Sequence, residues 1–263
     1  MSPPLTPLDV NRHNAEIHEN LRHWQRKPEL QAEYRRFYRE IAARLADLPP
    51  GPVLECGSGI GNLKSVLPDA ITSDLFANPW LDRQENLFAL SYADAALAAV
   101  VLFDVFHHLQ YPGTALRELH RVLKPGGRII LFEPAAGLLG RVVLGLFHHE
   151  PLALSAPIEW FAPTRFDPQA LGYYAAQGNA WRIFGKRNHQ ARLAETGLIV
   201  RELRYYPALP WLLTGGFRGP SLCPPIARSL AHGLERGLAL APQLFASRMI
   251  VVLEKAGPLG EPR

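Results

Sequence analysis

A glycine-rich turn followed by an acidic residue is the part of this sequence best suited to bind a ligand. Residues 53–56 have the pattern of a short strand, residues 62–67 that of a short helix, and between them stand Gly57, Gly59 and Gly61. Glycine lets the backbone bend tightly and approach a ligand, while a following helix presents free N–H groups to negative charge. Asp74 ends the next apolar stretch, about 20 residues after Glu55, where a carboxylate can accept two ribose hydroxyls. The pattern predicts a nucleoside-cofactor site.

Histidines are the second group of residues that could do chemistry, and four of them form two adjacent pairs: His107, His108, His148 and His149. Imidazole is the usual base near neutral pH and a common metal ligand. Adjacent residues rarely point their side chains at one ion, and the second pair has no evident further ligand group, so we predict no metal site. For the first pair, a structural hydrogen bond to nearby backbone is the alternative to a catalytic role.

Strands and helices alternate around these residues. Beyond the strands at 53–56 and 71–74, apolar runs predict strands at 86–90, 98–104, 128–133, 198–206 and 248–254. Helical spacing predicts two helices within 15–48, separated at Pro28, and further helices at 114–123 and 189–196. Such alternation forces right-handed crossovers and a mostly parallel, doubly wound α/β sheet that is covered on both faces.

The sequence divides into four predicted parts. Residues 1–50 form an N-terminal helical lid, 51–134 the cofactor-binding core, 135–185 a substrate cap insertion, and 186–263 the end of the core with a second insertion at 207–243. Both insertions are rich in proline, glycine and aromatic residues and should cover the carboxyl ends of the strands, where ligands of open sheets bind. A helix at 224–241 carries one apolar face: Ile226, Leu230, Leu234 and Leu238. We expect this face to pack onto the cap, with a membrane surface as the alternative.

Composition narrows the class of protein. The 263 residues are 48% hydrophobic and 20% charged, which is typical of a globular domain, and no apolar run approaches the roughly 18 residues of a membrane span. The N-terminus lacks the basic and apolar regions of a secretory signal, so we predict a cytoplasmic protein. Two cysteines, Cys56 and Cys223, do not form a disulfide framework. The net charge of +4 is dispersed, so we expect no nucleic-acid partner.

The glycine turn is not a dinucleotide motif, because G-x-G-x-x-G would need glycine where Asn62 stands. The sequence E-x-G-x-G-x-G at 55–61 resembles motif I of class I S-adenosylmethionine-dependent methyltransferases. Leu90-Ser91-Tyr92-Ala93-Asp94, Phe103-Asp104-Val105-Phe106-His107-His108-Leu109 and Arg121-Val122-Leu123-Lys124-Pro125-Gly126-Gly127-Arg128 are similar to later motifs of this family, in the same order. The resemblance covers residues 50–134 and implies the family's Rossmann-like, seven-stranded sheet.

The resemblance also implies which residues bind S-adenosylmethionine and its product S-adenosylhomocysteine. Glu55 and the backbone of Gly57 and Gly59 would hold the methionine part, while Gly61 would allow close helix packing. Asp74 would bind the ribose hydroxyls. The remaining contacts would come from four core residues and two tyrosines of the lid: Asn86 at the adenine amino group, Leu87 beside the ring, Asp104 and Val105 at the methionine end, and Tyr34 or Tyr38 at the methionine carboxylate.

The implied activity is methyl transfer to a small-molecule or lipid- or sugar-linked biosynthetic intermediate, with oxygen as the favoured acceptor atom. A hydroxyl must lose its proton, and we expect His108 or His149 to accept it. Three alternatives stay open: a cofactor-binding protein without transfer activity, a methyltransferase acting on a macromolecule, and an NAD-dependent oxidoreductase. Any membrane contact would be peripheral, and the sequence does not fix the oligomeric state.

Overall fold

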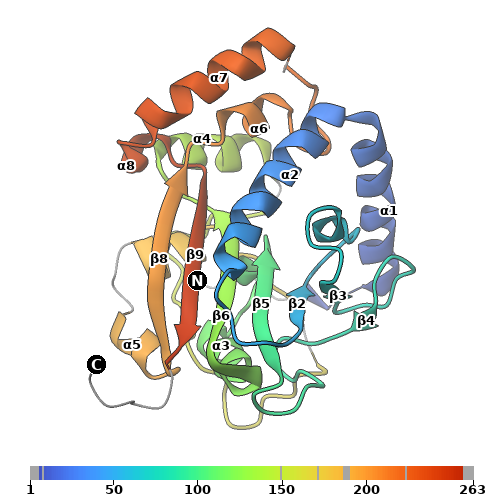
Figure 1. Cartoon of the computed structure of the whole chain (residues 1–263), viewed down its shortest axis with the longest axis vertical. Helices are drawn as coiled ribbons and strands as arrows, with labels where there is room; N and C mark the ends of the chain where they lie inside the picture. Colours follow the sequence, from blue (N-terminus) through green and yellow to red (C-terminus); the bar gives the residue numbers. More distant parts are fainter. Residues whose placement is uncertain are drawn as a thin grey trace.

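The computed structural model describes residues 6–7, 9–148, 150–170, 172–185, 190–222 and 224–256. A seven-stranded sheet with the order β4-β3-β2-β5-β6-β9-β8 forms the centre of the molecule (Figure 1). Its strands are β2 (Val53–Cys56), β3 (Ile71–Asp74), β4 (Arg83–Gln84), β5 (Leu97–Phe103), β6 (Leu123–Pro134), β8 (Leu198–Tyr206) and β9 (Arg248–Lys255). Strand β9 runs opposite to the other six strands of this sheet, which share one direction. The predicted doubly wound, mostly parallel sheet is confirmed.

The central strand β5 shows why both faces of the sheet are covered. All seven of its residues are buried, and successive side chains point to opposite faces. Val100 and Leu102 pack in the cluster that includes α3 (Pro112–Val122), whereas Val101 and Phe103 pack in the cluster that includes α2 (Pro28–Ala42). The side chains of β5 therefore pack into a hydrophobic layer on each face of the sheet, which fixes the position of the residues that follow the strand.

Two N-terminal helices precede the first core strand, as predicted. Helix α1 (Val10–Arg26) begins where the Asp9 carboxylate accepts the Asn11 N–H at 2.9 Å, and α2 begins with Pro28 at its first position. A proline there ends α1 without costing α2 a hydrogen bond, because first-turn N–H groups have no helical partner. Helix α2 packs on the sheet, while α1 lies farther out beside β3 (Figure 1).

The third strand lies earlier in the chain than predicted. We expected it at 86–90, but β4 is Arg83–Gln84, and Asn86 starts a tight turn. The Asn86 carboxamide oxygen accepts the Phe88 N–H at 2.9 Å, and the Asn86 carbonyl accepts the Ala89 N–H at 2.9 Å. Asparagine competes with strand ladders through this local bond, which explains the shift.

The first insertion forms a small cap on the sheet. It contains α4 (Leu138–Phe147), the two-residue strand β7 (Gly172–Tyr173) and a π-helical turn (Trp181–Gly185); α5 (Gln190–Ala194) follows. Strand β7 pairs with β1 (Thr6–Pro7), so the N-terminal segment lies against this insertion. The Gly113 N–H donates to the Trp160 carbonyl at 2.8 Å, and a Cβ at Gly113 would lie 2.5 Å from the Trp160 ring. Four aromatic side chains of this insertion are buried: Trp160, Tyr174, Trp181 and Phe184.

The second insertion contains α6 (Leu209–Leu213), α7 (Pro225–Leu238) and α8 (Pro242–Phe245). The prediction that the apolar face of this region packs onto the cap is wrong. Ile226, Leu230 and Leu234 are 74%, 66% and 61% exposed, because the opposite face of α7 is the one that contacts the protein. In the part of the chain that the structure describes, no helix combines the length and apolarity needed to cross a membrane.

Candidate active site

The glycine turn leaves β2 with three residues in the left-handed region, where φ is +71° at Gly57, +55° at Gly59 and +70° at Gly61. A Cβ at Gly57 would lie 2.3 Å from the Val105 side chain, so this glycine allows β2 and the segment after β5 to approach. A Cβ at Gly59 would meet no protein atom within 4 Å. The turn is therefore packed at Gly57 and open at Gly59.

Asp74 lies beside this open turn at the end of β3 and is buried. One carboxylate oxygen accepts the Gly59 N–H at 3.1 Å, and the other accepts the Leu75 N–H at 2.7 Å. His13 of α1 places its Nε2 atom 3.6 Å from the second oxygen. Helix α1 thus reaches the ribose side of the predicted cofactor site, a contact that the sequence did not indicate.

Glu55 supplies a buried acceptor without a donor. Its side chain is 2% exposed, and its Oε2 atom has no hydrogen-bond partner among the described residues. Burial, together with the nearby charge of Asp74, raises the pKa of Glu55 to about 8. A buried carboxyl oxygen without a donor is costly, and such an atom beside an open glycine turn fits a ligand that brings its own N–H group.

Asp104 and Arg248 form a charged pair behind the turn. The Arg248 guanidinium, 3% exposed at the start of β9, donates to the Asp104 carboxylate at 2.8 Å. Asp104 has φ +57°, a costly conformation for a non-glycine residue that the surrounding packing must hold. Burial and then the charge of Asp104 raise the pKa of Tyr34, while burial and then the charge of Glu55 raise that of Tyr38. Both predicted lid tyrosines are therefore buried near these carboxylates, and their contact with the methionine carboxylate stays a prediction.

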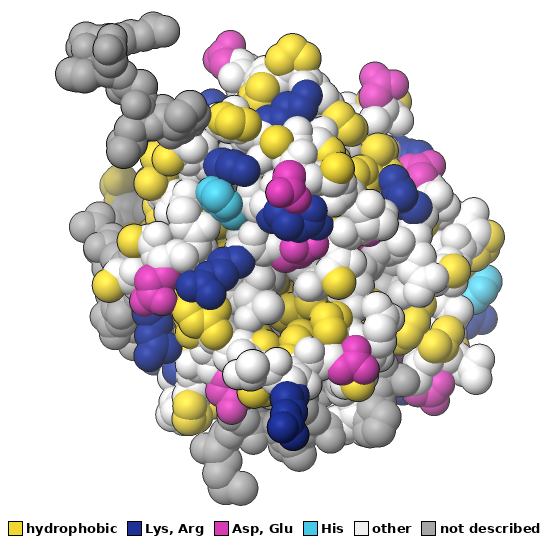
Figure 2. Space-filling model, turned by 90° about the horizontal axis from the view of Figure 1, so that it is seen from below, with side chains coloured by type: hydrophobic (Ala, Val, Ile, Leu, Met, Phe, Trp, Pro, Cys, Tyr) yellow, Lys and Arg dark blue, Asp and Glu magenta, His cyan; other side chains and the backbone are white. Residues whose placement is uncertain are grey.

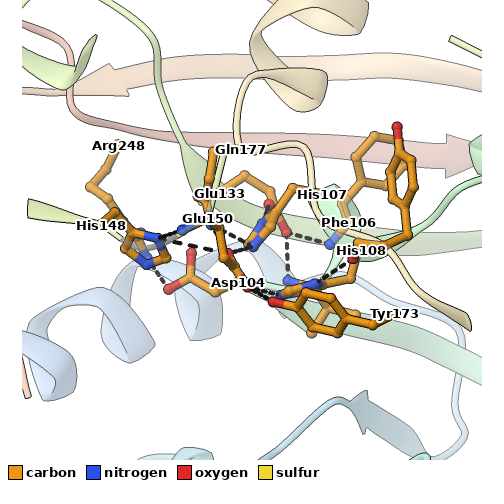
Figure 3. Close-up of polar contacts among 12 residues, drawn as sticks. Asp104, Phe106, His107, His108, Glu133, His148, Glu150, Tyr173, Gln177 and Arg248 are labelled. Atoms are coloured by element: carbon orange, nitrogen blue, oxygen red, sulfur yellow. Dashed lines mark hydrogen bonds and ion pairs between the residues drawn. The ribbon is translucent and has the colours of Figure 1, made fainter. Parts of the chain in front are cut away.

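Glu133, at the end of β6, fixes the turn that carries the first histidine pair (Figure 3). Its Oε1 atom accepts the N–H groups of Val105 at 2.9 Å and Phe106 at 2.7 Å, and its Oε2 atom accepts from His107 Nδ1 at 2.7 Å. Burial lowers the pKa of His107, but the attraction of Glu133 outweighs this effect and raises the pKa to about 10. His107 is therefore a buried imidazolium at neutral pH.

His108 has the opposite protonation state. Its Nδ1–H donates to the Tyr174 carbonyl at 2.9 Å, so in the neutral ring Nε2 carries the free lone pair. Burial and the charge of neighbouring His107 lower the pKa of His108 to about 4. The side chain is 34% exposed, so a neutral imidazole with an accepting Nε2 remains within reach of a ligand.

Glu150 joins the two histidines to the cap. Its carboxylate accepts hydrogen bonds from the Tyr173 hydroxyl and the Gln177 amide, and it lies 3.6 Å from Nε2 of both His107 and His108 (Figure 3). Burial raises the pKa of Glu150, but the bonds and charges of the two histidines outweigh it and hold the pKa well below its usual range. This arrangement brings an anionic carboxylate from the first insertion to the carboxyl end of β5.

The same cluster is the place where a metal ion would fit. Ligand atoms of His107, His108 and Glu150 lie within 4.8 Å of one another. However, a protonated His107 has no lone pair on Nε2 to offer an ion, and the Gln177 amide donates to Glu150. These contacts favour a network of hydrogen bonds over a cation site, and the absence of a metal stays a prediction.

Other predicted site residues have less direct positions. The Asn86 oxygen serves its own turn, and its amide donates to the Pro168 carbonyl at 2.8 Å; Leu87 is buried in the core. His149 lies outside the described residues. Its neighbour His148 is exposed and accepts the Glu150 N–H at 3.2 Å. The roles assigned to Asn86, Leu87 and His149 remain predictions.

The segment that holds most of this geometry resembles known proteins. Residues 54–131 match a family model described as a methyltransferase domain. That segment contains the glycine turn, Asp74 and both histidines of the first pair. A ubiquinone/menaquinone biosynthesis C-methyltransferase from Desulfotalea psychrophila is 27% identical over 116 residues, which cover 37% of this chain and 47% of that protein. Residues 54–131 therefore carry a methyltransferase domain, consistent with the class I S-adenosylmethionine-dependent enzymes.

Two further proteins match this chain over a shorter and a longer stretch. The uncharacterized protein YafE from Escherichia coli is 43% identical over 51 residues, covering 19% of this chain and 25% of that protein. A possible histamine N-methyltransferase from Thermotoga maritima shares the fold, with a TM-score of 0.50 and 15% identity over 91% of this chain and 99% of that structure. The chain spans about a quarter and about half of the lengths of the two curated relatives, so its substrate does not follow from theirs.

Proposed function

We propose that this domain transfers the methyl group of S-adenosylmethionine to an oxygen atom of a small-molecule or lipid- or sugar-linked intermediate. The residues fit that cofactor: the unpaired Oε2 atom of Glu55 would accept a hydrogen bond from its ammonium group, and Asp74 would accept its ribose hydroxyls. The open backbone at Gly59 would lie along its methionine part. When bound there, the cofactor supplies a methyl group on a positively charged sulfur, which is activated for direct displacement.

The hydrogen bond from His108 Nδ1 to the Tyr174 carbonyl is the observation that carries the choice of oxygen. Displacement at a methyl carbon needs alignment above all, and a base is needed only where the acceptor loses a proton, as a hydroxyl does. The bond from Nδ1–H to the Tyr174 carbonyl fixes the tautomer and leaves Nε2 free to accept that proton. Once His108 is protonated, the Glu150 carboxylate at 3.6 Å would stabilise its charge. His149 remains the alternative base.

Cofactor binding is tested by calorimetry with S-adenosylmethionine and S-adenosylhomocysteine. Asp74→Ala removes charge-assisted hydrogen bonds to the ribose and should weaken binding by about 10- to 100-fold. Asp69→Ala, in an exposed turn before β3, is the matched control and should bind as the wild type does. Equal affinity in both variants would contradict the role of Asp74.

Methyl transfer is tested by incubating the protein and labelled cofactor with aqueous and organic-solvent extracts of the source cells. A methylated small molecule or lipid detected by mass spectrometry, and formed at a much lower rate by His108→Asn, would support the proposal. Label found in protein or nucleic acid would instead show a macromolecular acceptor. Cofactor binding without any product would indicate a protein that binds the cofactor but transfers nothing.

A further inference from the structure

Exposed apolar side chains gather at one end of the molecule. Among the described residues, ten of the fourteen exposed large hydrophobic side chains belong to residues 138–147 and 222–244. These segments contain α4, α7 and α8, which Figure 1 shows together with α6 at the end toward which β5 points. A soluble protein usually scatters such residues singly, and their concentration marks an interaction surface.

Helix α7 presents its apolar face outward. Ile226, Leu230 and Leu234 recur at four-residue spacing on one side, and each is more than 60% exposed. On the other side Ala231 and Glu235 are buried, at 5% and 6% exposure. A helix on a protein surface normally buries its apolar stripe, so α7 has the reverse of the expected orientation.

Polar contacts with α2 hold α7 in this orientation. Glu235 forms an ion pair with Arg36, and His232 Nε2 lies 3.1 Å from the Glu33 carboxylate, which is 2% exposed. Turning the apolar stripe inward would break both partly buried contacts. The buried Glu33 carboxylate would then lose His232, which is costly. The outward stripe is therefore built into the fold.

The charges around the stripe indicate what it binds. Segments 138–148 and 207–247 contain four arginines that are not among the buried residues: Arg141, Arg218, Arg228 and Arg236. Their only acidic residue is the buried Glu235. By contrast, the opposite end of the molecule shows acidic and basic side chains interspersed (Figure 2). An outward apolar stripe beside these arginines, of which only Arg218 has a carboxylate partner among the described residues, Glu19 at 3.6 Å, suits the apolar layer and the negative head groups of an anionic bilayer.

We propose that α4, α7 and α8 form a docking surface for an anionic lipid bilayer, which the protein touches without crossing. The surface also reaches the candidate active site, because Leu146 and Phe147 are 72% and 82% exposed and directly precede His148, which contacts Glu150. An acceptor dissolved in the bilayer would therefore meet the protein at the cap. The docking itself does not depend on the proposed methyl transfer.

Co-sedimentation with vesicles tests this surface without any substrate. The wild-type chain should bind phosphatidylglycerol-containing vesicles, bind pure phosphatidylcholine vesicles more weakly, and be released from the anionic ones by salt. Leu230→Glu combined with Leu234→Glu should lower binding at least tenfold. Arg228→Gln combined with Arg236→Gln should lower binding to the anionic vesicles about fivefold per arginine.

Val10→Glu combined with Ile199→Glu is the matched control, because these residues are 44% and 41% exposed but lie outside the surface. It should bind vesicles as the wild type does, and all variants should keep the wild-type circular dichroism and cofactor affinity. No vesicle binding by the wild type, or equal binding by the two double glutamate variants, would overturn the proposal. So would a wild-type dimer that forms without vesicles and is lost in the Leu230/Leu234 variant, since the surface would then join two copies of the chain.

Discussion

His108 Nε2 lies 3.6 Å from Glu150 Oε1, and the same carboxylate lies 3.6 Å from Nε2 of His107 through its other oxygen. One carboxylate thus serves a protonated and a neutral imidazole that are adjacent in the chain. Opposite environments cause this difference: Glu133 contacts His107 directly, whereas His108 faces the positive charge of His107. Pairs of titratable groups whose pKa values are pushed apart are typical of sites that move protons.

Replacing His108 should impair turnover more than cofactor binding. His108→Asn keeps a polar group near the Tyr174 carbonyl but removes the accepting Nε2, so kcat should fall on the order of 100-fold or more. The affinity for S-adenosylmethionine, measured by calorimetry, should change less than threefold. His23→Asn, in the last turn of α1 and 31% exposed, is the control. A kcat equal to that of the wild type would exclude His108 as the base and leave His149 to be tested in the same way.

The carboxylate partner should matter less than the base itself. Glu150→Gln keeps the shape of the side chain but removes the charge that would stabilise a protonated His108, so kcat should fall about tenfold. Steady-state rates of the single and double variants measure the coupling. If the effects of His108→Asn and Glu150→Gln multiply fully, the two residues act independently and the proposed pair is contradicted.

Two glycines in the left-handed region can separate an effect on stability from an effect on cofactor binding. Gly59 and Gly126 have φ values of +55° and +77°, and a Cβ at either would meet no protein atom within 4 Å. Alanine at each should cost about 1–2 kcal/mol of unfolding free energy, measured by urea denaturation. Only Gly59→Ala should also weaken cofactor binding, since Gly126 lies outside the site. Equal cofactor affinity in the two variants would remove the turn at Gly59 from the site.

The parts of the fold that follow local rules could be predicted from sequence. Three sequence features each allow only one local structure, and the structure contains all three. They are the fully apolar β5, the proline between α1 and α2, and the glycine turn. The candidate cofactor residues lie on these elements. For that reason Glu55 and Asp74 could be placed near each other before the structure was known.

The partners of the histidines could not be found in the same way. Glu133 appears in the sequence only as the end of a strand, and Glu150 and Gln177 lie in an insertion whose path depends on tertiary packing. Their one signal is chemical: charged or amide groups at the end of a buried strand or among buried aromatics need partners. The orientation of α7 was mispredicted because an apolar stripe normally faces inward, and the ion pair of Glu235 with Arg36 joins residues distant in the chain.

Cofactor binding should release a proton from Glu55. Because its pKa is about 8, the Glu55 carboxyl group is largely protonated at pH 6.5 when no cofactor is bound. The ammonium group of the incoming cofactor favours the ionised carboxylate. Calorimetry at pH 6.5 in two buffers of different ionisation enthalpy should give binding enthalpies that differ for the wild type. In Glu55→Gln that difference should shrink and affinity should fall about tenfold. Identical wild-type enthalpies in the two buffers would show that Glu55 does not change protonation.

Removing metal ions should not affect methyl transfer. Gln177 donates to Glu150, and protonated His107 has no lone pair for an ion, so the cluster works as a hydrogen-bond network in our interpretation. Treatment with excess EDTA should leave kcat and the unfolding midpoint unchanged, and added Mg²⁺ or Zn²⁺ should not raise either. A loss of activity on chelation that one of these ions restores would assign the cluster to a metal.

The buried imidazolium of His107 should make stability depend on pH in a defined direction. Its folded-state pKa of about 10 lies above its ordinary value of 6.5, so its contribution is complete below pH 6.5 and disappears as the pH rises through 10. His107→Gln keeps a donor for Glu133 but cannot titrate. Between pH 6 and pH 9.5 the free energy of unfolding in urea should therefore fall more steeply for the wild type than for this variant. Parallel curves would mean that His107 is neutral in the folded protein, and the imidazolium beside Glu150 would have to be abandoned.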